Sequence, residues 1–166
     1  AGWSPADLRA AGWSPADLLA AGWSPAALRA AGWSPADLLA DGWSPAALRA
    51  AEQEWASIPV IPKLYTHLLQ EIKKGKRKHD QSIWGPECDP GRNLCGTPMC
   101  TAGHLVNLAG EIGYALLKKY GWPSAARMIH AKNRPDVPAQ NFGIITQQFA
   151  MAYIEERAAE EAERDA

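Results

Sequence analysis

Charge of one sign is not in excess in this chain of 166 residues. Seventeen Lys and Arg stand against 18 Asp and Glu, which gives a formal net charge of -1. This balance excludes a general electrostatic attraction to nucleic acid or to an anionic membrane, so any such site must be local. Long apolar runs are also lacking. The longest uncharged stretch, residues 137–154, contains three Gln, one Asn and one Thr, whose burial in lipid is costly. We therefore expect no membrane-spanning segment.

Cysteine is scarce as well, with three in the whole chain. The first residues carry neither a basic leader nor an apolar segment of the kind that directs secretion. An odd number of cysteines without a secretory signal favours reduced thiols over a disulfide framework. The sequence thus predicts a cytoplasmic protein whose thiols are available for metal binding or for chemistry.

Phenylalanine occurs only twice, whereas tryptophan occurs eight times. Five of the Trp belong to one decapeptide, [AD]-G-W-S-P-A-[AD]-L-[LR]-A, which is written five times over residues 1–50. A fixed period of this kind is the signature of a repeat architecture. In each unit the Ser suits a helix N-cap, and the following Pro suits the first helical position, where its missing N–H costs nothing. The Gly of the next unit suits the end of the helix, so each unit predicts a helix of about two turns.

A two-turn helix is not stable alone in water, so packing between units must hold it. The large apolar side chains of the units are the expected core of the array: Trp3, Trp13, Trp23, Trp33, Trp43, Leu8, Leu18, Leu28, Leu38 and Leu48. Position nine alternates between Arg and Leu, which favours two helices per superhelical turn and places Leu19 and Leu39 in apolar surroundings. We interpret the array as a short-helix solenoid, stabilised by docking on the rest of the chain or by pairing with a second copy. An exposed row of Trp that binds a ligand is the alternative.

The repeats resemble the A-G-[FW]-S-x-x-x-L decapeptide arrays that occur in assorted uncharacterised proteins. The resemblance covers all of residues 1–50. It implies a repeat array and no known activity.

Beyond the array, the sequence predicts a small all-helical domain over residues 58–166. The polar stretch 51–57 is interpreted as the end of the array and a short connection, so residues 1–57 form the array and the boundary lies near residue 57. An apolar stripe at helical spacing over residues 61–72 predicts the first helix of the domain, which Gly75 can end.

Three further helices are expected in this domain. The first runs from about residue 102 to residue 120, a short one follows Pro123, and a long one runs from about residue 142 to beyond residue 157. The polar turns at the end of the last helix are expected to project into solvent or to fray. The Pro- and Gly-rich residues 76–100 fit no long helix or strand and predict an irregular loop.

The cysteines lie in and just after this loop, as Cys88, Cys95, Cys100 and, four residues further on, His104. Cys100 and His104 share one face of the predicted helix. Three thiolates and one imidazole suit a tetrahedral zinc ion, which would also organise the loop, and His79 is a spare ligand. The sequence does not determine whether a metal is bound. The alternative is that the cysteines are free thiols, buried or half-exposed, and that the histidine lies on the helix surface.

Cys100 also has two chemical interpretations. A Cys at a helix N-terminus is expected to have a lowered pKa, so it could act as a nucleophile with His104 or His79 as the base. Cys95 and Cys100 could instead form a redox-active pair across the short C-G-T-P-M-C loop. No residue is assigned as catalytic on this evidence.

The segment from His79 to Gly103 contains D-Q-x-x-W followed by C-G-T-P-M-C-T-A-G. It resembles small uncharacterised bacterial proteins that are built around a D-Q-x-x-W and C-G-T-x-x-C-x-A-G pattern, over about residues 60–155. That pattern includes Cys95 and Cys100 but neither Cys88 nor a constant His104. The resemblance implies no established activity.

The run K-K-G-K-R-K-H, residues 73–79, is the one strong block of charge. It could contact phosphates of a nucleic acid, or it could be the solvated end of a helix whose dipole favours positive charge there. The acidic end of the chain could neutralise it. His67 and His130 lie beside apolar stripes and are expected to be ordinary packed or surface histidines.

The sequence therefore predicts an all-α protein in which a short-helix solenoid packs on a small helical domain with a long irregular loop. The function it favours is a non-enzymatic binding or assembly module, whose array mediates protein–protein contact or self-association. A small zinc- or thiol-dependent enzyme centred on Cys100 and His104 is the first alternative. Nucleic-acid binding through residues 73–79 is the second.

Overall fold

The computed structural model describes residues 11–13, 17, 39, 44–83, 98–137, 139–140, 142 and 145–164. These residues form five helices and one two-stranded sheet, which confirms the prediction of a mainly helical protein. The stacking of the decapeptide units falls outside them for the most part. No helix in this part of the chain is long and apolar enough to cross a lipid bilayer.

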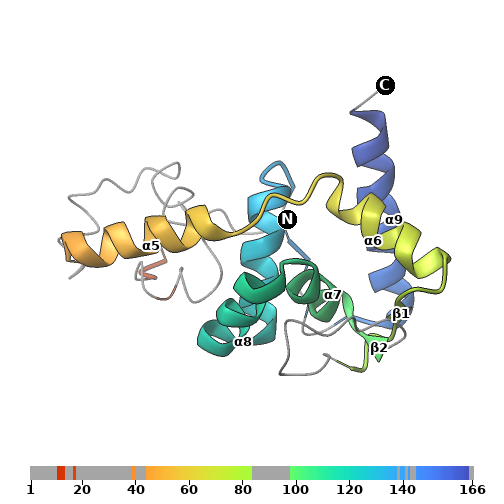
Figure 1. Ribbon diagram of the computed structural model, residues 1–166, viewed down its shortest axis with the longest axis horizontal. Helices are drawn as coiled ribbons and strands as arrows, with labels where there is room; N and C mark the ends of the chain where they lie inside the picture. Colours follow the sequence, from red (N-terminus) through yellow and green to blue (C-terminus); the bar gives the residue numbers. More distant parts are fainter. Residues whose placement is uncertain are drawn as a thin grey trace.

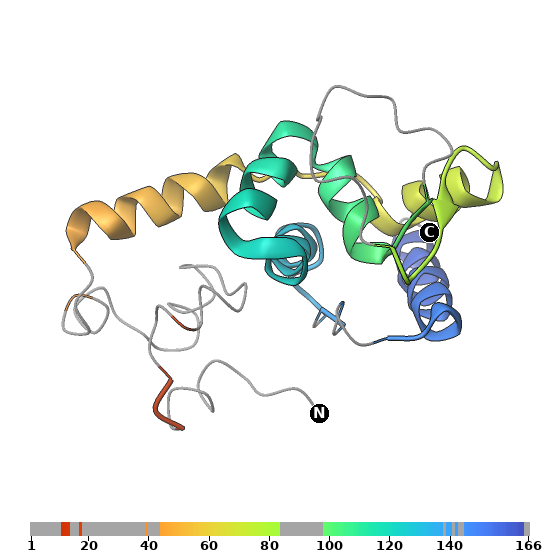
Figure 2. The ribbon, with the colours of Figure 1, turned by 90° about the horizontal axis from the view of Figure 1, so that it is seen from below.

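Helix α5 (Pro45–Ser57) contains the last decapeptide unit. Pro45 is its first residue, and the carbonyl of Ser44 accepts a hydrogen bond from the backbone N–H of Leu48 at 3.0 Å, as the Ser-Pro start predicts. Residues 51–57, interpreted as the end of the array and a short connection, continue the helix of the last unit. No Gly follows this unit, and Ala, Glu and Gln favour the helix. Figures 1 and 2 show α5 extending from one side of the molecule, away from α6 and α9.

Helix α6 (Leu64–Lys73) follows a short linker. It begins three residues later than the apolar stripe predicts, because Pro62 precedes Lys63, which has a left-handed φ of 50°. Gly75 ends the helical segment as predicted, with a φ of 70° that glycine adopts without strain. The linker is held by Asn133, whose side chain accepts from the N–H of Ile61 and donates to the carbonyl of Pro59.

Two short strands, β1 (Lys78–His79) and β2 (Pro98–Met99), pair in parallel within the loop that the sequence predicts as irregular. His79 lies opposite Met99 in this pairing. Helix α7 (Thr101–Leu108) starts directly after β2. The bridge therefore fixes the start of α7 against the segment that follows α6.

Helix α8 (Gly110–Asn133) packs against α7. The single helix expected from residue 102 to residue 120 is divided at Gly110, which has a φ of 61°. The backbone is not helical at Gly121, where φ is 76° and ψ is 169°. Helix α8 therefore consists of two helical segments, and the second, which contains Pro123, is the separate helix that the sequence predicts there. Both breaks occur at glycines, because the backbone there takes a left-handed φ.

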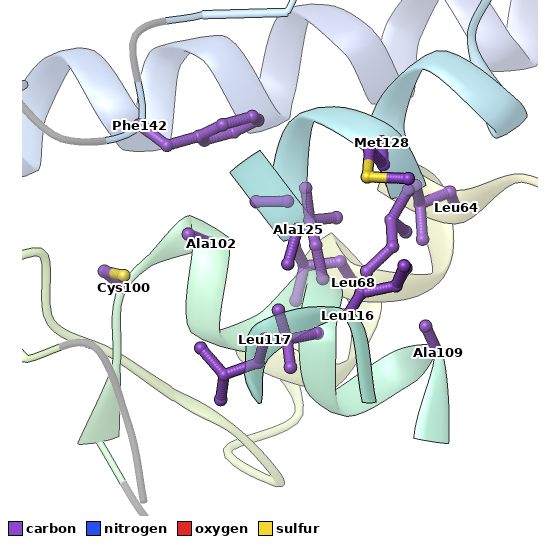
Figure 3. Packing of buried hydrophobic residues seen from close by; sticks show 14 of the residues in the cluster. Leu64, Leu68, Cys100, Ala102, Ala109, Leu116, Leu117, Ala125, Met128 and Phe142 are labelled. Carbon is purple, nitrogen blue, oxygen red and sulfur yellow. The ribbon is translucent and has the colours of Figure 1, made fainter. Parts of the chain in front are cut away.

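Helix α9 (Gln147–Glu163) lies against α6, and Figure 1 shows the two side by side. The expectation that its last turns project into solvent is wrong, because Arg157, Ala158 and Glu161 are all buried. The hydrophobic core lies between α6, α7, α8 and α9. Figure 3 shows the Leu64, Leu68, Leu116 and Met128 side chains grouped in this core, with Cys100 at its edge.

Candidate functional site

The start of α7 gathers several of the residues that the sequence singled out. The backbone N–H of Asp80 donates to the carbonyl of Met99 at 2.9 Å, and the N–H of Cys100 donates to the carbonyl of Ile83 at 2.5 Å. The side-chain oxygen of Gln81 accepts from the N–H of Thr101 at 3.2 Å. The segment that holds His79, Asp80 and Gln81 is therefore docked on the first turn of α7.

Cys100 is the N-cap residue of α7, and its sulfur accepts a hydrogen bond from the N–H of Gly103 at 3.4 Å. The side chain is buried, and this burial raises the pKa of the thiol, although the N–H groups of Gly103 and Ala102 act in the opposite direction. The prediction of a lowered pKa is therefore wrong, because removal of the thiolate from water outweighs the helix N-terminus. A thiol in this state is a poor nucleophile.

His104 lies one turn further along α7 and is completely buried. Its Nε2 donates to the carbonyl of Lys78 at 3.2 Å. Burial lowers its pKa to about 3, and the neighbouring His79 and Arg77 act in the same direction. The ring is thus neutral at physiological pH.

His79 comes from β1 and stands beside His104. The two ring centroids are 5.7 Å apart, and the ring planes differ by 23°. His79 Nε2 lies 3.0 Å from the hydroxyl oxygen of Thr101. Burial lowers the pKa of His79, with the side chains of Gln147 and Asp80 acting in the opposite direction. The pairing of these two rings depends on the β1–β2 bridge.

The structure brings together only two of the four residues that were proposed from the sequence as zinc ligands. Cys100 and His104 share the start of α7, whereas Cys88 and Cys95 lie outside the described residues. Within the described residues no group of three or more His, Cys, Asp or Glu side chains is arranged to hold a metal ion. The Cys95–Cys100 pair is likewise outside what the structure describes.

An open pocket of about 520 Å³ is lined by residues 79–82 and 145–147, and so includes His79 but not His104. Much of its lining is already hydrogen-bonded within the protein. Gln147 accepts from the N–H of Gln81 at 2.8 Å and donates to the carbonyl of His79 at 3.1 Å. Asp80 accepts from the Ser82 hydroxyl at 2.6 Å, an interaction that lowers the pKa of this carboxyl.

The basic run 73–79 is partly used inside the protein. Lys76 forms an ion pair with Glu71 at 3.3 Å, and the Arg77 guanidinium donates to the side chain of Asn107 at 2.7 Å. Lys73, Lys74, Lys76 and Lys78 are exposed. Glu161, near the end of α9, contacts the opposite end of α6 from this run.

A buried polar network links α6, α8 and α9. Of its members, His130 alone was singled out from the sequence, as an ordinary packed or surface histidine. The Tyr65 hydroxyl donates to His130 Nδ1 at 2.6 Å, and His130 Nε2 donates to the carbonyl of Val137 at 3.0 Å. Beside it, Glu161 accepts from the N–H groups of Tyr65 and Thr66 at 3.2 and 2.8 Å. A helical stripe through Ala150, Ile154, Ala158 and Glu161 is the signal that could have revealed the burial of Glu161.

This network predicts acid sensitivity. Burial lowers the pKa of His130 to about 4 in the folded protein, with Arg134 and Arg157 contributing, whereas an unfolded histidine has a pKa of about 6.5. Between these values only the unfolded chain takes up the proton. Stability from this residue is therefore lost as pH falls through this window, by about 1.4 kcal/mol per pH unit.

Urea unfolding of the unaltered chain and of His130→Gln at several pH values between 7 and about 4.5 measures this effect. We expect the unaltered chain to lose stability more steeply with falling pH than the variant. Equal slopes for the two proteins would contradict the assignment of a buried neutral His130.

Few of the predicted array residues can be assessed. Trp13 is 46% exposed and Leu39 is 39% exposed, whereas Leu48 is partly buried on α5. Both Trp13 and Leu39 were expected to be buried, so their exposure differs from the prediction. The remaining Trp and Leu of the expected array core lie outside the described residues.

Comparison of the chain with protein-family models, with curated proteins and with solved structures finds no match.

Proposed function

We propose that the chain is a binding and assembly module in which the decapeptide array mediates self-association. In this proposal the units stack as a short-helix solenoid, and copies of the chain meet through their arrays. The observation that carries it is Trp13, which leaves 46% of its surface exposed. Large aromatic side chains at a surface are the groups that contribute most to protein–protein contacts.

The attachment of α5 supports this proposal. Its contacts with the domain lie near its C-terminal end, where Glu54 accepts from the Tyr120 hydroxyl at 2.6 Å and pairs with Lys119 at 2.9 Å. The Lys132 ammonium also lies 5.4 Å from the ring centroid of Trp55. By contrast, Pro45, Ala46 and Arg49 near its start are exposed. Helix α5 is therefore anchored at its C-terminal end, and the last unit at its start extends away from the domain (Figure 2).

The two alternatives have weaker support. A thiol-dependent enzyme needs an activated Cys100, whereas burial raises the pKa of this thiol. Nucleic-acid binding through residues 73–79 has four exposed lysines in its favour. Against it, Lys76 pairs with Glu71 and the Arg77 guanidinium is hydrogen-bonded to Asn107.

Substitution of Trp13 tests the proposal. We expect Trp13→Ser to weaken self-association of the full chain at least about tenfold, because a shared aromatic contact is lost. Sedimentation velocity over a range of concentrations gives the association constant, and circular dichroism establishes that helix content is kept.

Val60→Ser is the matched control, because Val60 is 69% exposed and lies outside the array. We expect it to leave self-association unchanged. If Trp13→Ser and Val60→Ser associate as tightly as the unaltered chain, the Trp-bearing face of the array is not the contact surface.

A further inference from the structure

The structure leaves two buried ring nitrogens without partners in one place. His79 Nδ1 and His104 Nδ1 are both shielded from solvent, and neither has a hydrogen-bond partner of ordinary geometry in the described part of the chain. The Gln147 side chain lies near the His79 ring. A buried polar atom left in this way costs about 1–3 kcal/mol. Two such atoms on neighbouring rings therefore need an explanation.

The second nitrogen of each ring fixes the tautomer. A carbonyl can only accept, so His104 Nε2, 3.2 Å from the Lys78 carbonyl, carries the hydrogen. The Thr101 hydroxyl directs its own hydrogen to Gln81 Oε1 at 3.4 Å. It therefore accepts from His79 Nε2 at 3.0 Å. Both imidazoles carry Nε2–H and hold a lone pair at Nδ1.

This arrangement matches that of metal-binding histidines, which donate one ring N–H to a backbone carbonyl or another acceptor and bind the metal through the other nitrogen. The ring spacing is also suitable. Two imidazoles that share a tetrahedral zinc ion at about 2.0–2.1 Å have centroids roughly 5 Å apart. The observed separation is 5.7 Å. We propose that His79 and His104 bind a divalent transition metal such as Zn²⁺ through their Nδ1 atoms.

The charges around the pair set the expected strength of the site. The Asp80 carboxylate lies near His79 and favours a cation, whereas the Arg77 guanidinium lies near His104 and opposes one. No third His, Cys, Asp or Glu of the described residues joins the pair. The pair therefore supplies two ligands, and we expect weaker binding than in a closed four-ligand zinc site. The proposal does not depend on self-association of the array.

Zinc titration of the full chain after removal of metal with a chelator tests the pair. We expect His79→Gln to raise the dissociation constant for Zn²⁺ at least tenfold, measured by equilibrium dialysis. His79 is only partly buried, so this variant avoids the folding cost of replacing His104. The matched control is His67→Gln, because His67 is exposed on α6, and it should bind zinc as the unaltered chain does.

A second measurement needs no substitution. In the unaltered chain labelled with ¹⁵N at histidine, zinc should shift the Nδ1 resonances of His79 and His104 and leave that of His130 in place. Unchanged Nδ1 resonances, or unchanged affinity in His79→Gln, would overturn the proposal. It would also be overturned if zinc binding were lost in the Cys88→Ser, Cys95→Ser double variant but kept in His79→Gln, because thiolates would then hold the metal.

Discussion

Glu161→Ala should destabilise the protein by about 1.5–3 kcal/mol, because buried N–H groups lose a charged hydrogen-bond acceptor. Arg134 keeps its ion pairs with Asp136 and Glu160. The Glu161 carboxylate is 6% exposed and accepts three hydrogen bonds, from the N–H groups of Tyr65 and Thr66 and from the Thr66 hydroxyl. It also lies 3.6 Å from the buried guanidinium of Arg134. Its removal leaves the start of α6 without this cap, since Lys63 makes no side-chain capping bond.

Urea unfolding measures this loss, and Glu163→Ala is the matched control. Glu163 is the last residue of the same helix and is exposed, so we expect its removal to change stability by less than about 0.5 kcal/mol. Equal effects of the two substitutions would show that Glu161 does not cap α6 in solution.

Gly113→Ala should destabilise the protein by about 2–3 kcal/mol through overpacking. A Cβ atom at this position would lie 2.1 Å from the Val106 carbonyl oxygen and 2.9 Å from the Ala109 Cβ. The packing of α7 against α8 depends on this close approach, and the carbonyl belongs to the backbone, so α7 and α8 would have to separate.

The sign of the Gly113→Ala effect is the test. Helix propensity alone predicts that alanine at an internal helical position stabilises the protein by up to about 1 kcal/mol. Thermal or urea unfolding that shows a gain in stability would therefore contradict the close packing of α7 on α8.

The sequence predicted helix ends well where neighbouring residues determine them. The Ser44-Pro45 start of α5 and the end of α6 near Gly75 are both set by local backbone chemistry. Ends determined by distant residues were missed. Glu161 caps α6 from 95 or more positions away along the chain, and no local pattern around Leu64 contains that information.

In the candidate site, too, the features set by neighbouring residues were predicted, and those set by distant residues were not. The Cys100 and His104 spacing placed both residues at the start of one helix, which follows from helical periodicity. The raised pKa of Cys100 could not be predicted, because it arises from burial by side chains of other elements. The contact between His79 and His104 could not be predicted from the sequence either. It depends on the β1–β2 bridge, which has only two residue pairs and is too short to produce a periodic pattern in the sequence.

The array residues show the limit of a repeat pattern. Identical units predict a shared core, but the pattern does not say whether Trp13 packs within one copy or between copies. Trp13 is 46% exposed, which leaves surface that a contact between copies would bury. Its burial therefore has to be tested in the assembled protein.

Sedimentation equilibrium of the unaltered chain over a roughly hundredfold range of concentration tests the proposed self-association most directly. We predict an average mass that rises with concentration above the 18.0 kDa of one chain, towards a multiple of it. A mass of 18.0 kDa at every concentration would contradict the proposal that the array is an assembly surface between copies.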